Sequence, residues 1–218
     1  MNSLADSITQ HLVSPYNPNS LSNKMRRKRW QQLIAAFPEL PDMHVLDIGG
    51  DARAWRTSGL RPAHVTLLNL TDQDVAEPWM SAIVGDACEP LDKISNVDLV
   101  YSNSVIEHVG GHWRRTRFAD GIRSAGSHYW VQTPYRYFPI EPHFLFPGLQ
   151  YLPKAAQSAA IVRWPIGHYR GVRDRGQAVK SAMSIELLSI SELSAYFPDA
   201  KIKSEKFMTL TKSIIAVR

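Results

Sequence analysis

The chain has 218 residues, of which 44% are hydrophobic and 21% charged, a composition typical of a folded domain and not of a disordered segment. This length supports one well-buried core together with a lid or insertion. The single cysteine, Cys88, excludes an internal disulfide and a cysteine-based zinc site, so a reducing, cytoplasmic location is expected. Residues 1–30 lack the apolar core of a signal peptide, and no run is long enough to span a membrane.

The net charge of +5 is unevenly distributed, because residues 24–29 contain five of the 25 lysines and arginines. Such a cluster suggests a surface for nucleic acid or acidic lipid. It is more simply the solvated start of an amphipathic helix, since apolar residues follow at helical spacing at Trp30, Leu33, Ile34 and Phe37. A third interpretation is that Arg26 or Arg29 closes over a bound ligand.

Residues 1–38 are expected to form an amino-terminal arm and a helix over 22–37, which Pro38 ends. Residues 39–218 are expected to form one domain in which strands and helices alternate. Strands are expected at 43–48, 64–69, 82–85, 97–102 and 128–133, followed by a terminal pair over 200–208 and 212–218. Helices are expected at 51–58, 113–124, 153–162 and 189–196, the last with Ser191 as its cap. Residues 134–153 are aromatic and proline-rich, which predicts a long functional loop.

A glycine turn follows the first strand of this domain. The apolar stretch His44–Ile48 leads directly into Gly49 and Gly50, a sequence that predicts a buried strand and a sharp turn. The next three strands also end at polar residues, which are Asn69, Asp86, Ser102 and Asn103. Because the carboxyl ends of parallel strands meet at one edge of a sheet, these residues predict a single cofactor crevice there.

The turn favours S-adenosylmethionine over NAD. A dinucleotide site needs a G-x-G-x-x-G turn, because its pyrophosphate lies against a helix amino terminus with little room for side chains. Here Asp51 and Arg53 follow Gly49 and Gly50, and the later glycine is missing. S-adenosylmethionine has no phosphate and requires only a tight turn with polar groups around it.

Over residues 40–218 the chain resembles the small bacterial class I S-adenosylmethionine-dependent methyltransferases, mycobacterial sugar O-methyltransferases among them. The segments that carry the resemblance are VLDIGG (45–50), VTLLN (65–69), GDA (85–87), SNSVIEH (102–108), QTPYRYFPIEPH (132–143), YFPDA (196–200) and KSIIAV (212–217). The resemblance implies an α/β, Rossmann-like fold with a seven-stranded, mostly parallel sheet and a reversed last strand. A substrate lid is expected over 134–188, after the fifth strand.

Five cofactor-binding residues are implied for the methionine part of S-adenosylmethionine. The resemblance places Asp47, Gly49 and Gly50 along this part, and Ser102 and Asn103 beneath the sulfonium. In this family a third glycine is common near position 51 or 52, and this chain has none.

Three further residues are implied for the nucleoside part. Asn69 is expected to bind the ribose hydroxyls, Asp86 the adenine amino group, and Ala87 to flank the ring. The family commonly has an acidic residue where Asn69 stands. Asparagine can still bind a diol, but it lacks the charge-assisted strength of a carboxylate.

Methyl transfer to a hydroxyl requires alignment of the two reactants and removal of a proton, for which histidine is the usual base near neutral pH. His143 is the preferred base, with Glu141 orienting its ring, and His108 is the second candidate. Each histidine could instead be a structural loop residue. A divalent metal bound by Glu107, His108, Glu141 and His143 is a further alternative, but no ligand spacing is diagnostic and no metal ligand is assigned.

The expected substrate walls are Tyr135, Arg136, Tyr137, Phe138, Tyr169 and Arg170, whose aromatic and charged side chains suit a carbohydrate or another polar metabolite. The leading hypothesis is therefore O-methylation of a sugar or small polar metabolite, with a mannoside or oligosaccharide as a guess by analogy. The partner would be this acceptor, and a homodimer is left open.

Two other functions are considered. RNA or DNA methylation would use the basic segment 24–29, although the Asn/Asp-Pro-Pro-aromatic motif of base N-methylating enzymes is absent at 102–105. A non-enzymatic, S-adenosylmethionine-binding regulatory module is the other alternative. Tight cofactor binding without an effect of substitutions at His108 and His143 would favour it.

Overall fold

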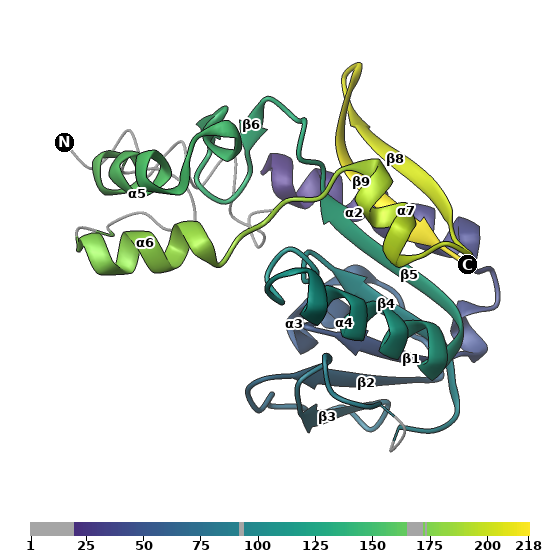
Figure 1. Ribbon diagram of the computed structural model, residues 1–218. Helices are drawn as coiled ribbons and strands as arrows, with labels where there is room; N and C mark the ends of the chain where they lie inside the picture. Colours follow the sequence, from purple (N-terminus) through teal and green to yellow (C-terminus); the bar gives the residue numbers. More distant parts are fainter. Residues whose placement is uncertain (1–19, 92–93, 165–171, 173) are drawn as a thin grey trace.

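The computed structural model describes residues 20–91, 94–164, 172 and 174–218, and a seven-stranded sheet forms its centre (Figure 1). The strands are β1 (His44–Ile48), β2 (His64–Asn69), β3 (Met80–Val84), β4 (Val97–Asn103), β5 (Gly126–Pro134), β8 (Lys201–Phe207) and β9 (Leu210–Val217). Their order is β3-β2-β1-β4-β5-β9-β8. Neighbours from β3 to β5 pair in parallel, whereas β9 is antiparallel to both β5 and β8. The predicted α/β fold with a reversed last strand is confirmed.

Helices cover both faces of the sheet. One face is covered by α2 (Leu21–Ala36) and α3 (Ala52–Ser58), and the other by α4 (His112–Ala125) and α7 (Ile190–Tyr196). Successive side chains of β1 point to opposite faces, so Val45 packs with the first pair of helices and Leu46 with the second. Both faces are therefore buried, as is usual for parallel strands. Among the described residues, none of the helices combines the length and apolar character that crossing a bilayer requires.

The predicted insertion after the fifth strand is present between β5 and α7. It contains β6 (Ile140–Glu141), β7 (Phe146–Pro147), the 3-10 helix η2 (Leu149–Tyr151), α5 (Lys154–Arg163) and α6 (Arg175–Met183). Its own apolar cluster includes Phe144, Ile161, Ala178 and Leu187. Figure 1 shows α5 and α6 beside the sheet and not over it. The sequence did not predict α6, whose buried face consists of small alanines that give a weak periodicity. A role of this insertion as a substrate lid stays a prediction.

Three local predictions are corrected. β3 begins at Met80 and not at residue 82, because the Met80 side chain already packs in the core. Ser189, and not Ser191, caps α7: its hydroxyl accepts from the Glu192 N–H while the Glu192 carboxylate accepts from the Ser189 N–H. Ile34 is 40% exposed, because α2 contacts the sheet along a narrower stripe than its sequence suggested.

Arg29 ties α2 to the rest of the fold. Its Nη1 donates to Asn103 Oδ1 at the end of β4 (2.5 Å), and its Nη2 donates to Glu205 Oε2 on β8 (2.7 Å). The arginine is nearly buried and the glutamate fully so. Within the basic segment, Arg29 is therefore not on the solvated face, while Lys24, Arg27 and Lys28 are exposed. The interpretation of residues 24–29 as a solvated helix start is therefore corrected for Arg29.

We expect Arg29→Met to lower the free energy of unfolding by about 3–5 kcal/mol, because it leaves Glu205 buried without its positive partner. Arg56→Met is the matched control, since Arg56 pairs with Glu77 on the surface and its loss should have a much smaller effect. Urea unfolding of the three proteins measures the difference. Equal effects of the two substitutions would contradict the structural importance of the buried pair.

Candidate active site

The turn after β1 requires both of its glycines. Gly49 has a φ of +72°, and its N–H donates to the Leu68 carbonyl (2.8 Å), which locks the turn to β2. A Cβ atom on Gly49 would lie 2.6 Å from Val105 Cγ2, and one on Gly50 would lie 1.8 Å from Asp47 Oδ2. Side chains at either position would displace Val105 or Asp47, so the packing beneath the turn requires glycine at both positions.

The carboxyl of Asp47 lies buried beneath this turn. Its Oδ2 accepts a hydrogen bond from Trp55 Nε1 (2.7 Å), whereas its Oδ1 has no partner among the described residues. Burial raises the pKa of Asp47 to about 7. Trp55 packs against Trp30 and Tyr101, with ring centroids 5.0 Å and 5.8 Å apart. Trp55 was not among the residues predicted from the sequence. A tryptophan eight positions after Asp47, on the helix that follows the turn, could have indicated it.

Asn69 connects the turn to the end of β2. Its Nδ2 donates to the Gly50 carbonyl (3.1 Å) and its Oδ1 accepts from the Leu70 N–H (2.8 Å). A carboxylate at this position could accept but not donate, so it would leave the Gly50 carbonyl without this bond. The turn itself therefore explains why asparagine replaces the acidic residue that the family resemblance implies.

Asp86 follows β3 and is held on both carboxylate oxygens. Oδ1 accepts from the Cys88 N–H (2.9 Å) and Oδ2 from Arg114 Nη2 (2.6 Å). Partial burial opposes ionisation of Asp86, but these hydrogen bonds and the charge of Arg114 outweigh it and lower its pKa. Arg114 also donates to the Val109 carbonyl (2.6 Å). The contact between Arg114 and Asp86 was not predicted from the sequence. Ala87, the residue after Asp86, is buried.

The predicted cofactor residues of β1, β2 and β4 converge at one edge. In the sheet Ile48 pairs with Leu68 of β2 and with Ser102 of β4, so the residues that follow these strands lie side by side. Ser102 is fully buried and its Oγ has no partner among the described residues. Asn103 is held by Arg29.

The insertion brings His143 against His108. Their Nε2 atoms are 3.1 Å apart, and the rings meet edge to face with centroids at 4.9 Å. The Nδ1 of His143 lies 2.7 Å from Glu141 Oε1, and the Nδ1 of His108 lies 3.3 Å from the Ser184 carbonyl. The structure thus joins the three residues proposed from sequence as catalytic.

Glu107 completes this histidine cluster, which we define as Glu107, His108, Glu141 and His143. Glu107 is buried, Oε2 accepts from Thr133 Oγ1 (2.9 Å), and Oε1 has no partner among the described residues. Burial raises the pKa of Glu107. His108 keeps an edge exposed to solvent, but the protein atoms packed around its ring, together with the adjacent His143, lower its pKa to about 4. Burial also disfavours the charged form of His143, but the hydrogen bond and charge of Glu141 outweigh it and raise the His143 pKa.

Two of the predicted substrate walls present aromatic rings beyond the end of β5. The rings of Tyr135 and Tyr137 have centroids 5.5 Å apart, and Tyr137 stacks near Tyr151 at 6.4 Å. Tyr137 and Tyr151 are both more than half exposed. Tyr169 and Arg170 lie outside the described residues.

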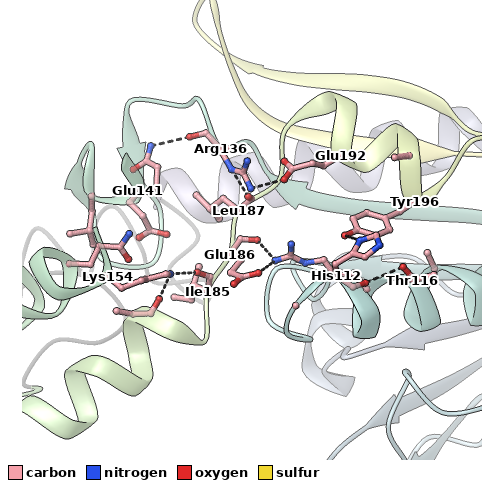
Figure 2. A pocket seen from close by; sticks show the side chains of 18 of the residues that line it. His112, Thr116, Arg136, Glu141, Lys154, Ile185, Glu186, Leu187, Glu192 and Tyr196 are labelled. Carbon is pink, nitrogen blue, oxygen red and sulfur yellow. Dashed lines mark hydrogen bonds and ion pairs between the residues drawn. The ribbon is translucent and has the colours of Figure 1, made fainter. Parts of the chain in front are cut away.

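The Arg136 side chain contacts a different part of the molecule from these tyrosine rings. Its Nε donates to the Leu187 carbonyl (2.8 Å) and its Nη2 to Glu192 Oε1 (2.9 Å), so the guanidinium joins β5 to α7. Figure 2 shows it in a cavity of about 1140 Å³ between the insertion and the helices α4 and α7. Of the histidine cluster only Glu141 lines this cavity, and none of the predicted cofactor residues does. The cavity is therefore distinct from the edge of the sheet where those residues converge.

No protein-family model matches the chain, and no curated protein is significantly similar to it in sequence. Solved structures share its fold at low identity. The methyltransferase domain of bacterial CtHen1 is 12% identical with a TM-score of 0.55, over 88% of this chain and 97% of that one. An S-adenosylmethionine-dependent methyltransferase of Mesorhizobium loti is 15% identical, with a TM-score of 0.53 over 87% and 96%. A Rhodobacter sphaeroides protein assigned to the Zn-dependent alcohol dehydrogenases is 12% identical, with a TM-score of 0.59 over 87% of each chain.

These similarities concern the fold alone, and strand order distinguishes its variants. Dinucleotide-binding sheets have the order 3-2-1-4-5-6. In this chain the antiparallel β9 lies between β5 and β8, which gives 3-2-1-4-5-7-6 when the seven strands are counted along the chain. The chain therefore has the fold of the class I S-adenosylmethionine-dependent methyltransferases.

The pKa of Asp47 predicts a pH dependence of stability. Because the folded protein holds this proton up to about pH 7, whereas a free aspartate loses it near 3.8, raising the pH through this range favours the unfolded state. The contribution is at most about 4 kcal/mol. We expect the free energy of unfolding of the wild type, relative to Asp47→Asn, to fall between pH 4 and 7 in urea titrations. A difference that is constant with pH would contradict a raised pKa.

Proposed function

We propose that this protein is an S-adenosylmethionine-dependent O-methyltransferase acting on a hydroxyl of a sugar or another small polar metabolite. The observation that carries the proposal is the cradle after β1. Gly49 and Gly50 cannot carry side chains there, and beneath them the buried Asp47 has an oxygen without a partner among the described residues. This cradle fits the ammonium group of the cofactor, which donates hydrogen bonds and supplies the compensating positive charge.

A dinucleotide fits the same edge less well. Its pyrophosphate binds at a helix amino terminus, where free N–H groups and the helix dipole attract negative charge. At α3 the side chain of Asp51 caps that position and accepts from the Arg53 N–H (2.8 Å). A pyrophosphate would thus meet the carboxyl groups of Asp47 and Asp51, which favours S-adenosylmethionine.

The remaining strand ends would hold the other parts of the cofactor. Asn69 retains an N–H and a lone pair for the ribose hydroxyls, and Asp86 retains a lone pair for the adenine amino group beside Ala87. Ser102, whose hydroxyl has no partner among the described residues, and Asn103 lie at the end of β4, where they would contact the methionine part.

When bound, the cofactor supplies an electrophilic methyl group, so the protein must align an acceptor hydroxyl and accept its proton. We assign proton acceptance to His143. A carboxylate only accepts hydrogen bonds, so Glu141 holds the ring proton of neutral His143 on Nδ1 and leaves Nε2 as the base. His108, whose Nε2 faces this atom, would orient the hydroxyl or take the proton in its place.

The acceptor we propose is a sugar, because aromatic rings in an exposed segment suit the apolar faces of pyranosides. Tyr135, Tyr137 and Tyr151 supply such rings within the insertion that also carries His143. A mannoside or oligosaccharide is the first acceptor to be tested.

A nucleic-acid acceptor is the alternative, motivated by the exposed side chains of Lys24, Arg27 and Lys28 on α2. It would require binding that weakens steeply with salt, since phosphate contacts release counterions. Binding of S-adenosylmethionine without any transfer, unaffected by changes at His108 and His143, would instead favour a regulatory module.

Calorimetric titration tests the cofactor. We expect saturable binding of S-adenosylmethionine and no binding of NAD. Asp47→Asn should weaken binding of S-adenosylmethionine roughly 10- to 100-fold, as loss of a hydrogen bond to a charged group does. Asp98→Asn, an exposed change at the other end of β4, is the control. Absence of S-adenosylmethionine binding to the folded wild type would refute the proposal.

Methyl transfer from labelled S-adenosylmethionine to a panel of glycosides tests the chemistry. His143→Ala should reduce kcat roughly 10²- to 10⁴-fold, the usual contribution of a general base, without weakening cofactor binding. His128→Ala removes an exposed histidine at the far end of β5 and should retain activity. Transfer to RNA and to no glycoside would favour the alternative acceptor.

A further inference from the structure

The histidine cluster brings three potential metal-binding atoms, each with a lone pair in the unprotonated form, face to face. Glu107, His108 and His143 each offer one atom that could bind a metal, and these three atoms lie within 4.8 Å of one another. The two Nε2 atoms are 3.1 Å apart. Such an arrangement of lone pairs is repulsive unless a positive species lies between them.

The outer partners of the two rings determine where their protons lie. Glu141 accepts from His143 Nδ1 (2.7 Å), and the Ser184 carbonyl can only accept from His108 Nδ1 (3.3 Å). In neutral rings both protons are then on Nδ1, and both Nε2 atoms are bare. This is the tautomer that metal-binding histidines adopt when a carboxylate or carbonyl holds the other nitrogen.

The buried carboxylate of Glu107 indicates a cation at the same place, independently of the two histidine rings. Its carboxylate is 1% exposed, Thr133 binds one oxygen, and the other oxygen has no partner among the described residues. A buried carboxylate oxygen without a partner is costly, and a cation bound by the adjacent Nε2 atoms would compensate it.

We propose that Glu107, His108 and His143 bind a divalent first-row transition-metal ion such as Zn²⁺ or Mn²⁺. Mixed imidazole and carboxylate ligands suit these ions. Bonds of about 2.0–2.1 Å at tetrahedral angles place two nitrogens about 3.3–3.4 Å apart, close to the separation present here. Glu141 and Thr133 orient the ligands from outside, and both oxygens of Glu141 are occupied, by His143 and by the Phe144 N–H.

Three protein ligands leave a coordination position open, as in catalytic metal sites. An acceptor hydroxyl bound there would have a lowered pKa and could lose its proton to water, since the Nε2 of His143 would then be a metal ligand and not a base. This role rests on the proposed methyl transfer, whereas the cation site itself rests on the contacts of the described residues.

The test uses the untagged full-length protein, freed of metal with a chelator. Calorimetric titration with Zn²⁺ and Mn²⁺, and the visible absorption spectrum with Co²⁺, should show one ion bound per chain. His108→Ala and Glu107→Gln should weaken binding more than about 100-fold, and Glu141→Gln about 10- to 100-fold, as outer-sphere changes do. His128→Ala is the matched histidine control and should bind as the wild type does.

His108 is exposed, so His108→Ala should fold even if a change at buried Glu107 does not, and thermal melting checks this. Lack of stoichiometric binding, or equal binding by wild type and His108→Ala, would overturn the site. A shared proton would then occupy the cluster. Titration of the same samples with S-adenosylmethionine separates the two proposals. Cofactor binding without metal binding refutes only the cation site, and metal binding without cofactor binding refutes only the proposed function.

Discussion

The buried carboxyl of Asp47 constrains the carboxyl edge of the sheet. A carboxyl in this position needs a hydrogen-bond donor, and Trp55 provides one from the first turns of α3. Its Oδ2 occupies the space that a Cβ on Gly50 would need, so the turn above it must be glycine. Trp55 is in turn fixed by Trp30 of α2 and Tyr101 of β4. One unfavourable burial therefore determines the turn, the orientation of α3 and the surroundings of the ligand.

Segments far from one another in the chain complete this edge. The helix α2 contributes Arg29, which holds Asn103 at the end of β4 through a buried ion pair with Glu205. The insertion contributes His143, which meets His108 just after β4. The end of β4 is thus where the amino-terminal helix, the sheet and the insertion come together. Reactive groups placed there are held by rigid elements on three sides, which favours the alignment that group transfer needs.

The carboxyl edge of the sheet and the cavity differ in which of their charged and polar groups have partners. In the cavity the charged side chains are largely neutralised by one another, as Arg115 is by Glu186 and Arg136 by Glu192. At the edge, acceptor oxygens of Asp47, Glu107 and Ser102 lack partners among the described residues, whereas in the cavity the atoms without partners include Arg115 Nε and Gln150 Oε1. Buried polar groups without partners are rare in proteins, so each of them needs an explanation such as a bound water, an ion or a catalytic role. Glu141, which belongs to the histidine cluster and lines the cavity, is the residue that both regions share.

Much of the fold could be predicted from the sequence, because strand and helix patterns are local. The alternation in His44–Ile48 and His64–Asn69, and the pair Gly49–Gly50, predicted the strands and the turn, while the cofactor crevice at this edge stays a prediction. What the sequence could not determine were the partners of individual side chains. His108 meets His143 across 35 positions, and Arg29 reaches Asn103 across 74. Such contacts depend on how the chain reverses between elements, which no local pattern encodes. The sequence by itself therefore determined the backbone framework and the residue types at the edge. Tertiary packing decided which polar groups were neutralised and which have no partner among the described residues, since burial and proximity exist only once distant segments have met.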